Sequence, residues 1–208
     1  MDSYRKFLWL ELIGLDNTEA DCGMAKYLDT LGFVPDAISI FMWGPDFLHQ
    51  HTGMREDGLF PPDVGAYMDF WYPGPKSSNP PWSKFQLKQV VENFHAYNVK
   101  VLFSIFPRSL ADRFHKEWFT DHPELRLVTS GIPYDPNTLN PLRRFNDGSY
   151  YEDFIIEKAR EVLLDYGFDG WHLADGYNHP WCQLCHGDYS DDMVDQFLKA
   201  SDFEIPDW

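Results

Sequence analysis

The chain has 208 residues, of which 17% are aromatic and 24% charged, and its formal net charge is -16 at pH 7. This composition is typical of a folded globular domain and excludes a disordered chain. The strong negative charge would repel a phosphate backbone or an anionic bilayer surface, so it argues against nucleic acid and membranes as partners. No segment approaches the roughly 18 apolar residues of a membrane span, and Phe7–Leu10 is too short for a signal-peptide core. We therefore expect a cytoplasmic protein.

Four short segments have the character of buried β-strands. Each is rich in β-branched or aromatic residues and is bounded by Gly, Pro or Asp. Their apolar character is nearly continuous rather than alternating, which predicts burial on both faces, as in a parallel sheet. The predicted strands are Phe7–Leu15, Ala37–Trp43, Val99–Phe106 and Phe168–Ala174.

Helical patterns fill the intervals between these strands. Gly32 and Gly167 stand where helices commonly end, and Ser83 and Ser190 stand where helices commonly begin. Apolar residues recur at helical spacing between these signals. The predicted helices are Glu19–Leu31, Ser83–Tyr97, Leu110–Phe119, Tyr150–Tyr166 and Ser190–Ala200.

The alternation of strands and helices predicts βα units with right-handed crossovers and a parallel sheet, an α/β fold. Four such units are half of a (β/α)8 barrel, which needs about 250 residues. We interpret residues 1–208 as a single catalytic-type βα domain, the N-terminal half of a longer, truncated barrel; an open four-stranded α/β domain is the structural alternative. Half a barrel would expose sheet edges and apolar faces, which predicts self-association.

The most informative segment is Gly167–Tyr177, which reads GFDGWHLADGY. It follows the clearest predicted helix and places a carboxylate, Asp175, at the carboxyl end of a predicted strand. In parallel βα proteins, ligands and catalytic groups gather at these ends. Aromatic residues surround the carboxylate in sequence, a combination that favours sugar chemistry.

This segment resembles the fourth-strand segment of alpha-amylase-like and related (β/α)8 glycoside hydrolases, and the preceding His122-Pro123-Glu124 fits the same pattern. The resemblance covers residues 100 to 200 and implies a glycosidase whose fourth strand carries the nucleophile. The chain departs from the alpha-amylase pattern, because the spacing from His172 puts Ala174 at the nucleophile position. Asp175 lies one residue later, and the resemblance to related families with a second acidic residue implies Asp175 as the catalytic carboxylate.

The resemblance implies a glycoside or oligosaccharide as substrate, no cofactor, and a retaining mechanism that uses two carboxyl groups. The second, the acid/base, would lie on a later strand outside these 208 residues, or would be Asp46 or Asp69. A turn-capping role is the alternative for Asp175, and packing or ion pairing is the alternative for the residues proposed to hold the sugar. Those substrate-binding candidates are Trp43, Asp46, Asp69, Arg108, His172 and Tyr177.

Two other acidic residues have different expectations. Asp169 begins the fourth predicted strand, at the end of a barrel that serves stability, so we expect a structural role. Glu11 lies inside the first predicted strand, where a carboxylate needs a partner. The sequence leaves open whether that partner is a core group or a substrate.

Two rival functions remain open. Cys182-Gln183-Leu184-Cys185-His186 matches a haem-attachment pattern, and with His179 also a zinc pattern, so a metal-binding module is one rival. Ordinary loop residues are the simpler interpretation of that segment, and we predict no metal. The second rival is a non-catalytic carbohydrate-binding or assembly domain that uses the same aromatic loops.

Overall fold

The computed structural model describes residues 6–42, 44–60, 80–107, 116–129, 138–174 and 187–203. Its strands form one sheet in the order β1-β2-β3-β4, and every neighbouring pair is parallel. The predicted parallel α/β fold is therefore confirmed. The strands are β1 (Phe7–Glu11), β2 (Ala37–Phe41), β3 (Lys100–Ile105) and β4 (Gly170–Leu173).

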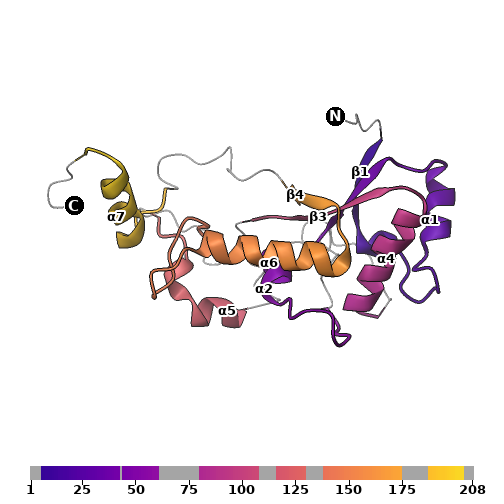
Figure 1. Ribbon diagram of the computed structural model, residues 1–208, viewed down its shortest axis with the longest axis horizontal. Helices are drawn as coiled ribbons and strands as arrows, with labels where there is room; N and C mark the ends of the chain where they lie inside the picture. The colour runs from indigo at the N-terminus through magenta and orange to yellow at the C-terminus, as the bar shows by residue number, and fades with distance from the viewer. Residues whose placement is uncertain are drawn as a thin grey trace.

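Helices α1, α4 and α6 lie in series along one face of this sheet (Figure 1). Helix α1 packs against α4, and α4 packs against α6. Right-handed crossovers between strands that are neighbours in sequence always return the helices to the same face. Four units wound in one direction match half of a (β/α)8 arrangement. The helices are α1 (Met24–Leu31), α2 (Asp46–His49), α4 (Lys84–Ala96), α5 (Lys116–Asp121), α6 (Tyr151–Tyr166) and α7 (Asp191–Ala200).

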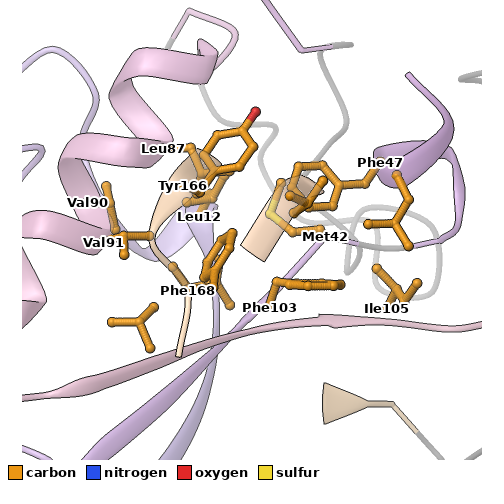
Figure 2. Close-up of a cluster of buried hydrophobic side chains, with 14 of the residues drawn as sticks. Leu12, Met42, Phe47, Leu87, Val90, Val91, Phe103, Ile105, Tyr166 and Phe168 are labelled. Carbon is orange, nitrogen blue, oxygen red and sulfur yellow. The ribbon is translucent and has the colours of Figure 1, made fainter. Parts of the chain in front are cut away.

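The hydrophobic core lies between the helices and the sheet. Alternate residues of each strand face the helices, and Ile38, Ile40, Val101 and Phe103 are fully buried there. Figure 2 shows Phe103 beneath a cluster of side chains from the helices and their connections. The labelled members are Leu12, Met42, Phe47, Leu87, Val90, Val91, Phe103, Ile105, Tyr166 and Phe168.

The opposite face of the sheet is concave. The Phe7 and Trp9 rings on β1 lie 5.9 and 6.0 Å from the ring of His172 on β4. Two strands separate β1 from β4, and in a flat sheet this would put them roughly 14 Å apart. The sheet therefore curves strongly, as a barrel wall does. We call the face that carries Phe7, Trp9, Ser39 and His172 the concave face.

The predicted ends of several strands and helices are wrong. The first strand stops at Glu11, and Leu12–Gly14 forms a 3-10 turn. This turn places the Leu12 side chain in the core, where it has no exposed surface. The first helix begins at Met24 rather than Glu19. The Asp21 carboxylate accepts hydrogen bonds from the Gly23 and Ala25 N–H groups, which fixes the start of the helix there.

Helix α2 was not predicted from the sequence. It lies in the connection between β2 and α4, and its Phe47 packs against Phe103, Tyr166 and Phe60 at ring-centroid distances of 5.8 to 5.9 Å. This helix has only four residues, too few to show a helical period. Its stability comes from packing against α6.

The predicted helix caps are confirmed. Ser83 accepts a hydrogen bond from the Gln86 N–H while the Gln86 side chain accepts from the Ser83 N–H, a reciprocal pair that starts α4. Gly167 ends α6 with a φ of 80°, and Ser190 accepts from the Met193 N–H at the start of α7. Among the described residues, no helix has the length and apolarity to cross a bilayer.

A second region lies beyond the carboxyl ends of the strands (Figure 1). It contains α5, the 3-10 turn η2 (Pro123–Leu125), the segment 138–150 and α7; we call it the distal lobe. The predicted helix Leu110–Phe119 corresponds to α5, which is described from Lys116 and ends at Asp121. On β1, Phe7 and Trp9 are 44% and 49% exposed, and self-association stays a prediction.

Candidate functional site

The carboxyl ends of the four strands carry one row of side chains on the concave face. Strand pairing aligns Glu11 with Phe41, Phe41 with Ser104, and Ser104 with His172. Parallel pairing puts aligned residues on the same face of a sheet. One row thus contains a carboxyl group, a hydroxyl group and an imidazole, at the end of the sheet where βα proteins bind ligands.

His172 is the best-defined member of this row. Its Nδ1 lies 3.1 Å from the Ser39 hydroxyl, a hydrogen bond that joins β4 to β2 across the strand between them. The rings of Phe7 and Trp9 meet the imidazole edge to face. Ser39 is fully buried, so this contact fixes the orientation of the ring. An oriented imidazole can donate or accept a proton at its second nitrogen.

Ser104 supplies a buried hydroxyl group next to this histidine. Its Oγ has no solvent exposure and makes no hydrogen bond with any described residue. Glu11, at the other end of the row, is half-buried. A polar atom that is buried without a partner costs stability, so such atoms are concentrated where function requires them.

Asp46 lies elsewhere. It is the first residue of α2, is only 4% exposed, and lines a small cavity of about 60 Å³ together with Met42, His51 and Tyr166. Met42, Phe47 and Tyr166 belong to the helix-side core, so the described contacts do not bring Asp46 to His172. Burial raises the pKa of the Tyr166 phenol well above its ordinary value, which keeps that group neutral.

The remaining predicted site residues lie outside the described residues. These are Trp43, Asp69, Arg108, Asp175 and Tyr177, as well as the alternative metal cluster of His179, Cys182, Cys185 and His186. The described chain continues to Ala174, whose N–H donates to the Ile105 carbonyl and extends the pairing of β4 with β3. The assignment of Asp175 therefore stays a prediction.

Asp169 has the structural role that its sequence position predicts. Its carboxylate accepts hydrogen bonds from Lys100 Nζ, the Val101 N–H and His95 Nε2 at 2.7 to 2.9 Å. Desolvation would raise the pKa of Asp169, but these three donors outweigh it and hold the pKa below its ordinary value. The residue ties α4, β3 and β4 together at the amino ends of the strands.

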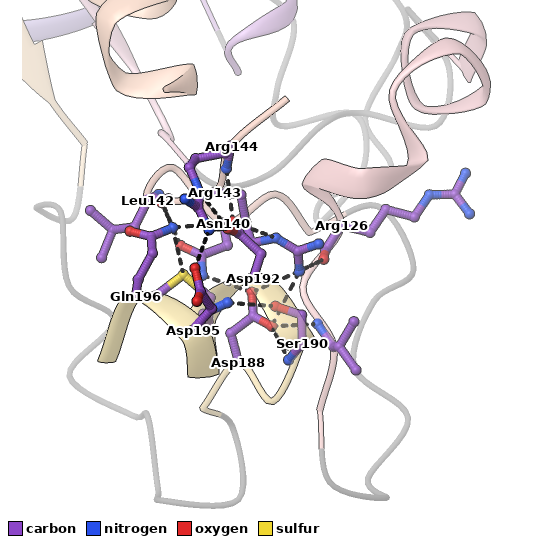
Figure 3. A network of polar contacts seen from close by, with 12 residues as sticks. Arg126, Asn140, Leu142, Arg143, Arg144, Asp188, Ser190, Asp192, Asp195 and Gln196 are labelled. Atoms are coloured by element: carbon purple, nitrogen blue, oxygen red, sulfur yellow. Dashed lines mark hydrogen bonds and ion pairs between the residues drawn. The ribbon is translucent and has the colours of Figure 1, made fainter. Parts of the chain in front are cut away.

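Sequence reasoning missed the polar network of the distal lobe, which Figure 3 shows. The Arg144 guanidinium donates to Asp192 at 2.6 Å and to Asp195 at 2.7 Å, and Arg143 pairs with Asp188. The hydrogen bonds to Asp195 and Asp192 raise the pKa of Arg144. The available signal was the adjacent pair of arginines together with the acidic series that begins α7.

Within the described residues, no group of three or more His, Cys, Asp or Glu side chains could hold a metal ion. This finding does not test the Cys182–His186 segment. The described part of the concave face offers hydroxyl, carboxyl, imidazole and aromatic groups, a donor set suited to a polyhydroxyl ligand.

Comparison with known proteins reveals a likeness of fold. No protein-family model matches the sequence, and no curated protein matches it. Among solved structures, a noncanonic maltogenic alpha-amylase from Thermotoga neapolitana matches 86% of this chain at 17% identity and a TM-score of 0.50. A debranching enzyme from Nostoc punctiforme matches 81% at 15% identity, and its TM-score of 0.41 supports no argument.

The chain spans 41% of the length of that amylase. At this identity the match shows the fold alone, and it agrees with the interpretation of the sheet as part of a (β/α)8 barrel.

Proposed function

We propose that this chain is the part of a glycoside hydrolase that carries the catalytic nucleophile. The observation that carries the proposal is the row of Glu11, Ser104 and His172 along the carboxyl ends of the parallel strands. This is the end of a βα barrel at which chemistry takes place. The rings of Phe7 and Trp9 beside His172 provide flat apolar surfaces of the kind that sugar rings pack against.

In the proposed mechanism, Asp175 attacks the anomeric carbon as its bond to the leaving-group oxygen breaks, and the acid/base protonates that oxygen. Water, activated by the same acid/base, then hydrolyses the covalent glycosyl-enzyme intermediate and frees Asp175. A retaining mechanism requires a second carboxyl group roughly 5 to 5.5 Å from the first, as the acid/base. The candidates for that group are a carboxylate on a later strand and Asp46, which lines the helix-side cavity. Asp69 remains the other candidate.

His172 would position the substrate or the catalytic carboxylate through its second ring nitrogen. The Ser39 hydrogen bond sets the direction of the ring before substrate arrives, which is the preorganisation that catalysis needs. We propose that Trp43, Arg108 and Tyr177 add further sugar contacts from the connections that follow the strands.

The test is hydrolysis of a panel of aryl glycosides by the longest natural form of the chain, with Asp175→Asn beside it. We expect turnover of at least one glycoside and a loss of more than ~100-fold in the variant, with unchanged circular dichroism. Asp29→Asn, an exposed residue of α1, is the matched control and should keep full activity. Activity that survives Asp175→Asn would remove the nucleophile assignment.

A non-catalytic carbohydrate-binding domain is the second candidate. The exposure of Phe7 and Trp9, 44% and 49%, favours it, because such rings can hold a sugar without any catalytic group. Saccharide binding that depends on Trp9, with no turnover by any form of the protein, would replace the hydrolase proposal with this one.

A further inference from the structure

A second concavity lies in the distal lobe, away from the concave face of the sheet. It is an open groove of about 620 Å³ between the segment 143–148 and the N-terminal end of α7. Small-molecule sites commonly have volumes of roughly 300 to 1,000 Å³, so a ligand of two or three sugar units would fit. We call it the lobe groove; its polar and aromatic lining includes Glu124, Phe145, Asn146, Tyr189 and Asp191.

The walls of the lobe groove are held by buried ionic contacts (Figure 3). The Asp188 carboxylate, whose side chain is 4% exposed, accepts from Asn140 Nδ2 at 2.7 Å and from the Ser190 N–H at 3.0 Å. It also pairs with Arg143 on the facing segment. A groove with walls joined in this way exists before a ligand arrives, which reduces the entropy cost of binding.

One side of the lobe groove rests on a packed aromatic cluster. Phe145 lies 5.2 Å from the His122 ring and 5.7 Å from the Phe154 ring, and it also contacts Trp118. Trp118 in turn stacks on His49 at 3.9 Å. These contacts connect the groove to α5, α6 and α2, so the Phe145 ring is fixed in place.

The charges of the lobe groove select against anionic ligands. Both arginines at the groove are engaged by aspartates: Arg144 by Asp192 and Asp195, and Arg143 by Asp188 and Asp192. Their positive charge is therefore compensated locally. Carboxylates beyond these pairs make the surface acidic, and a phosphate or sulfate would be repelled.

The remaining groups suit hydroxyl groups and an apolar ring face. Glu124 Oε2 is buried and accepts no hydrogen bond from any described residue, so it offers an acceptor to a ligand hydroxyl. Asn146 is exposed and offers both a donor and an acceptor. The Tyr189 ring is 45% exposed and gives a flat surface for stacking.

We propose that the lobe groove is a second saccharide-binding site, which holds a neutral sugar segment by Tyr189, Asn146 and Glu124. The choice of a sugar as ligand rests on the proposed function. The segment 138–150 leads from β3 into α6, and α7 follows β4, so the groove is built from connections that leave the carboxyl ends of the strands. A longer oligosaccharide would be held there in addition to its contact with the concave face.

The test is calorimetric titration of the longest natural form with maltotriose, cellotriose and xylotriose at roughly millimolar concentrations. We expect one of them to bind, and we expect Tyr189→Ala to weaken binding about ten-fold or more. Tyr97→Ala is the matched control: Tyr97 is 48% exposed, similar to Tyr189, and it ends α4 outside the groove. Asn146→Ala is a second groove variant at an exposed position, where folding should be unaffected.

The background Asp175→Asn separates this proposal from the proposed function. A binding step that persists in Asp175→Asn but disappears in both groove variants, with the binding at the concave face left in place, supports the lobe groove, whether or not any form hydrolyses glycosides. A titration curve that neither groove variant changes, or no binding of any trisaccharide, overturns the proposal. Binding of a lysine-rich peptide in place of the sugars also overturns it, because the groove would then be a cation site.

Discussion

The two ends of the parallel sheet treat their polar groups differently. At the amino end, the Asp169 carboxylate is held by donors from α4 and β3 at 2.7 to 2.9 Å. At the carboxyl end, Ser104 is buried without a hydrogen bond to any described residue, and His172 is oriented by its hydrogen bond with Ser39 and by the rings of Phe7 and Trp9. Among the described residues, the Asp169 carboxylate at the amino end is fully hydrogen-bonded, whereas the buried Ser104 hydroxyl at the carboxyl end is not.

This difference indicates that polar groups at the amino end of the sheet serve stability, while those at the carboxyl end serve function. A carboxylate that receives several hydrogen bonds, as Asp169 does, stabilises the fold and has little capacity left for a ligand. A buried polar group without a partner costs stability, and it is retained where a ligand or a reaction supplies the partner. We therefore expect substitutions at the amino end to change the free energy of unfolding and substitutions at the carboxyl end to change activity.

The largest expected effect is on activity. We expect His172→Ala to lower kcat/KM for the preferred aryl glycoside about 100-fold, equal to about 2.7 kcal/mol of transition-state stabilisation, because the oriented imidazole is lost. His95→Ala is the matched control, since His95 binds Asp169 at the opposite end of the sheet. Equal losses of activity in the two variants would contradict the assignment of activity to the carboxyl end and stability to the amino end of the sheet.

At the amino end, we expect Asp169→Ala to lower the free energy of unfolding by about 2 kcal/mol, since three donors lose a charged acceptor. Urea unfolding followed by circular dichroism measures this change. The matched control Asp29→Ala removes an exposed carboxylate of α1 and should change stability by less than about 0.5 kcal/mol. A loss in Asp169→Ala as small as in this control would show that the three contacts contribute little.

The contribution of Asp169 should also depend on pH. Its pKa is lower in the folded chain than the value of about 3.9 in an unfolded one, so its stabilisation is complete above that value. It is lost as pH falls through the lower folded pKa. The difference in unfolding free energy between the wild type and Asp169→Asn should therefore be largest near neutral pH and should decrease below about pH 4. A difference that stays constant on acidification would contradict the ionised role.

The smallest effect is expected at the hydrogen bond between His172 and Ser39 on the concave face. Ser39→Ala removes the hydrogen bond to His172 Nδ1, and we expect a loss of about 1 kcal/mol in stability. Because the imidazole loses its fixed orientation, the pH dependence of kcat/KM should change as well. Ser39→Thr keeps the hydroxyl and should restore the wild-type pH profile; failure to do so would indicate a packing effect.

Local signals were sufficient for much of the fold. Ser83, Gly167 and Ser190 marked helix ends correctly because capping depends on the residues within one turn. The strands were found because their apolar runs are short and punctuated. Helix α2 was missed because its stability comes from the packing of Phe47 against residues more than fifty positions away.

The site was less accessible to sequence reasoning. His172 was identified from its strand, but its contacts with Phe7 and Ser39 depend on the curvature of the sheet, which no local pattern encodes. The lobe groove was missed entirely, since its walls join Arg144 to Asp192, 48 residues apart. Asp46 was chosen for its place after a strand, and the structure puts it on the helix side of the sheet.

The most direct test of the account locates the bound sugar. Histidine side-chain resonances would be recorded by NMR for the longest natural form, during titration with the saccharide that the aryl glycoside panel selects. The account predicts that the His172 resonances shift with saturation while those of His95 do not, because sugar binds at the carboxyl end of the concave face. Shifts at His95 alone, or an unperturbed His172 at saturating sugar, would contradict it.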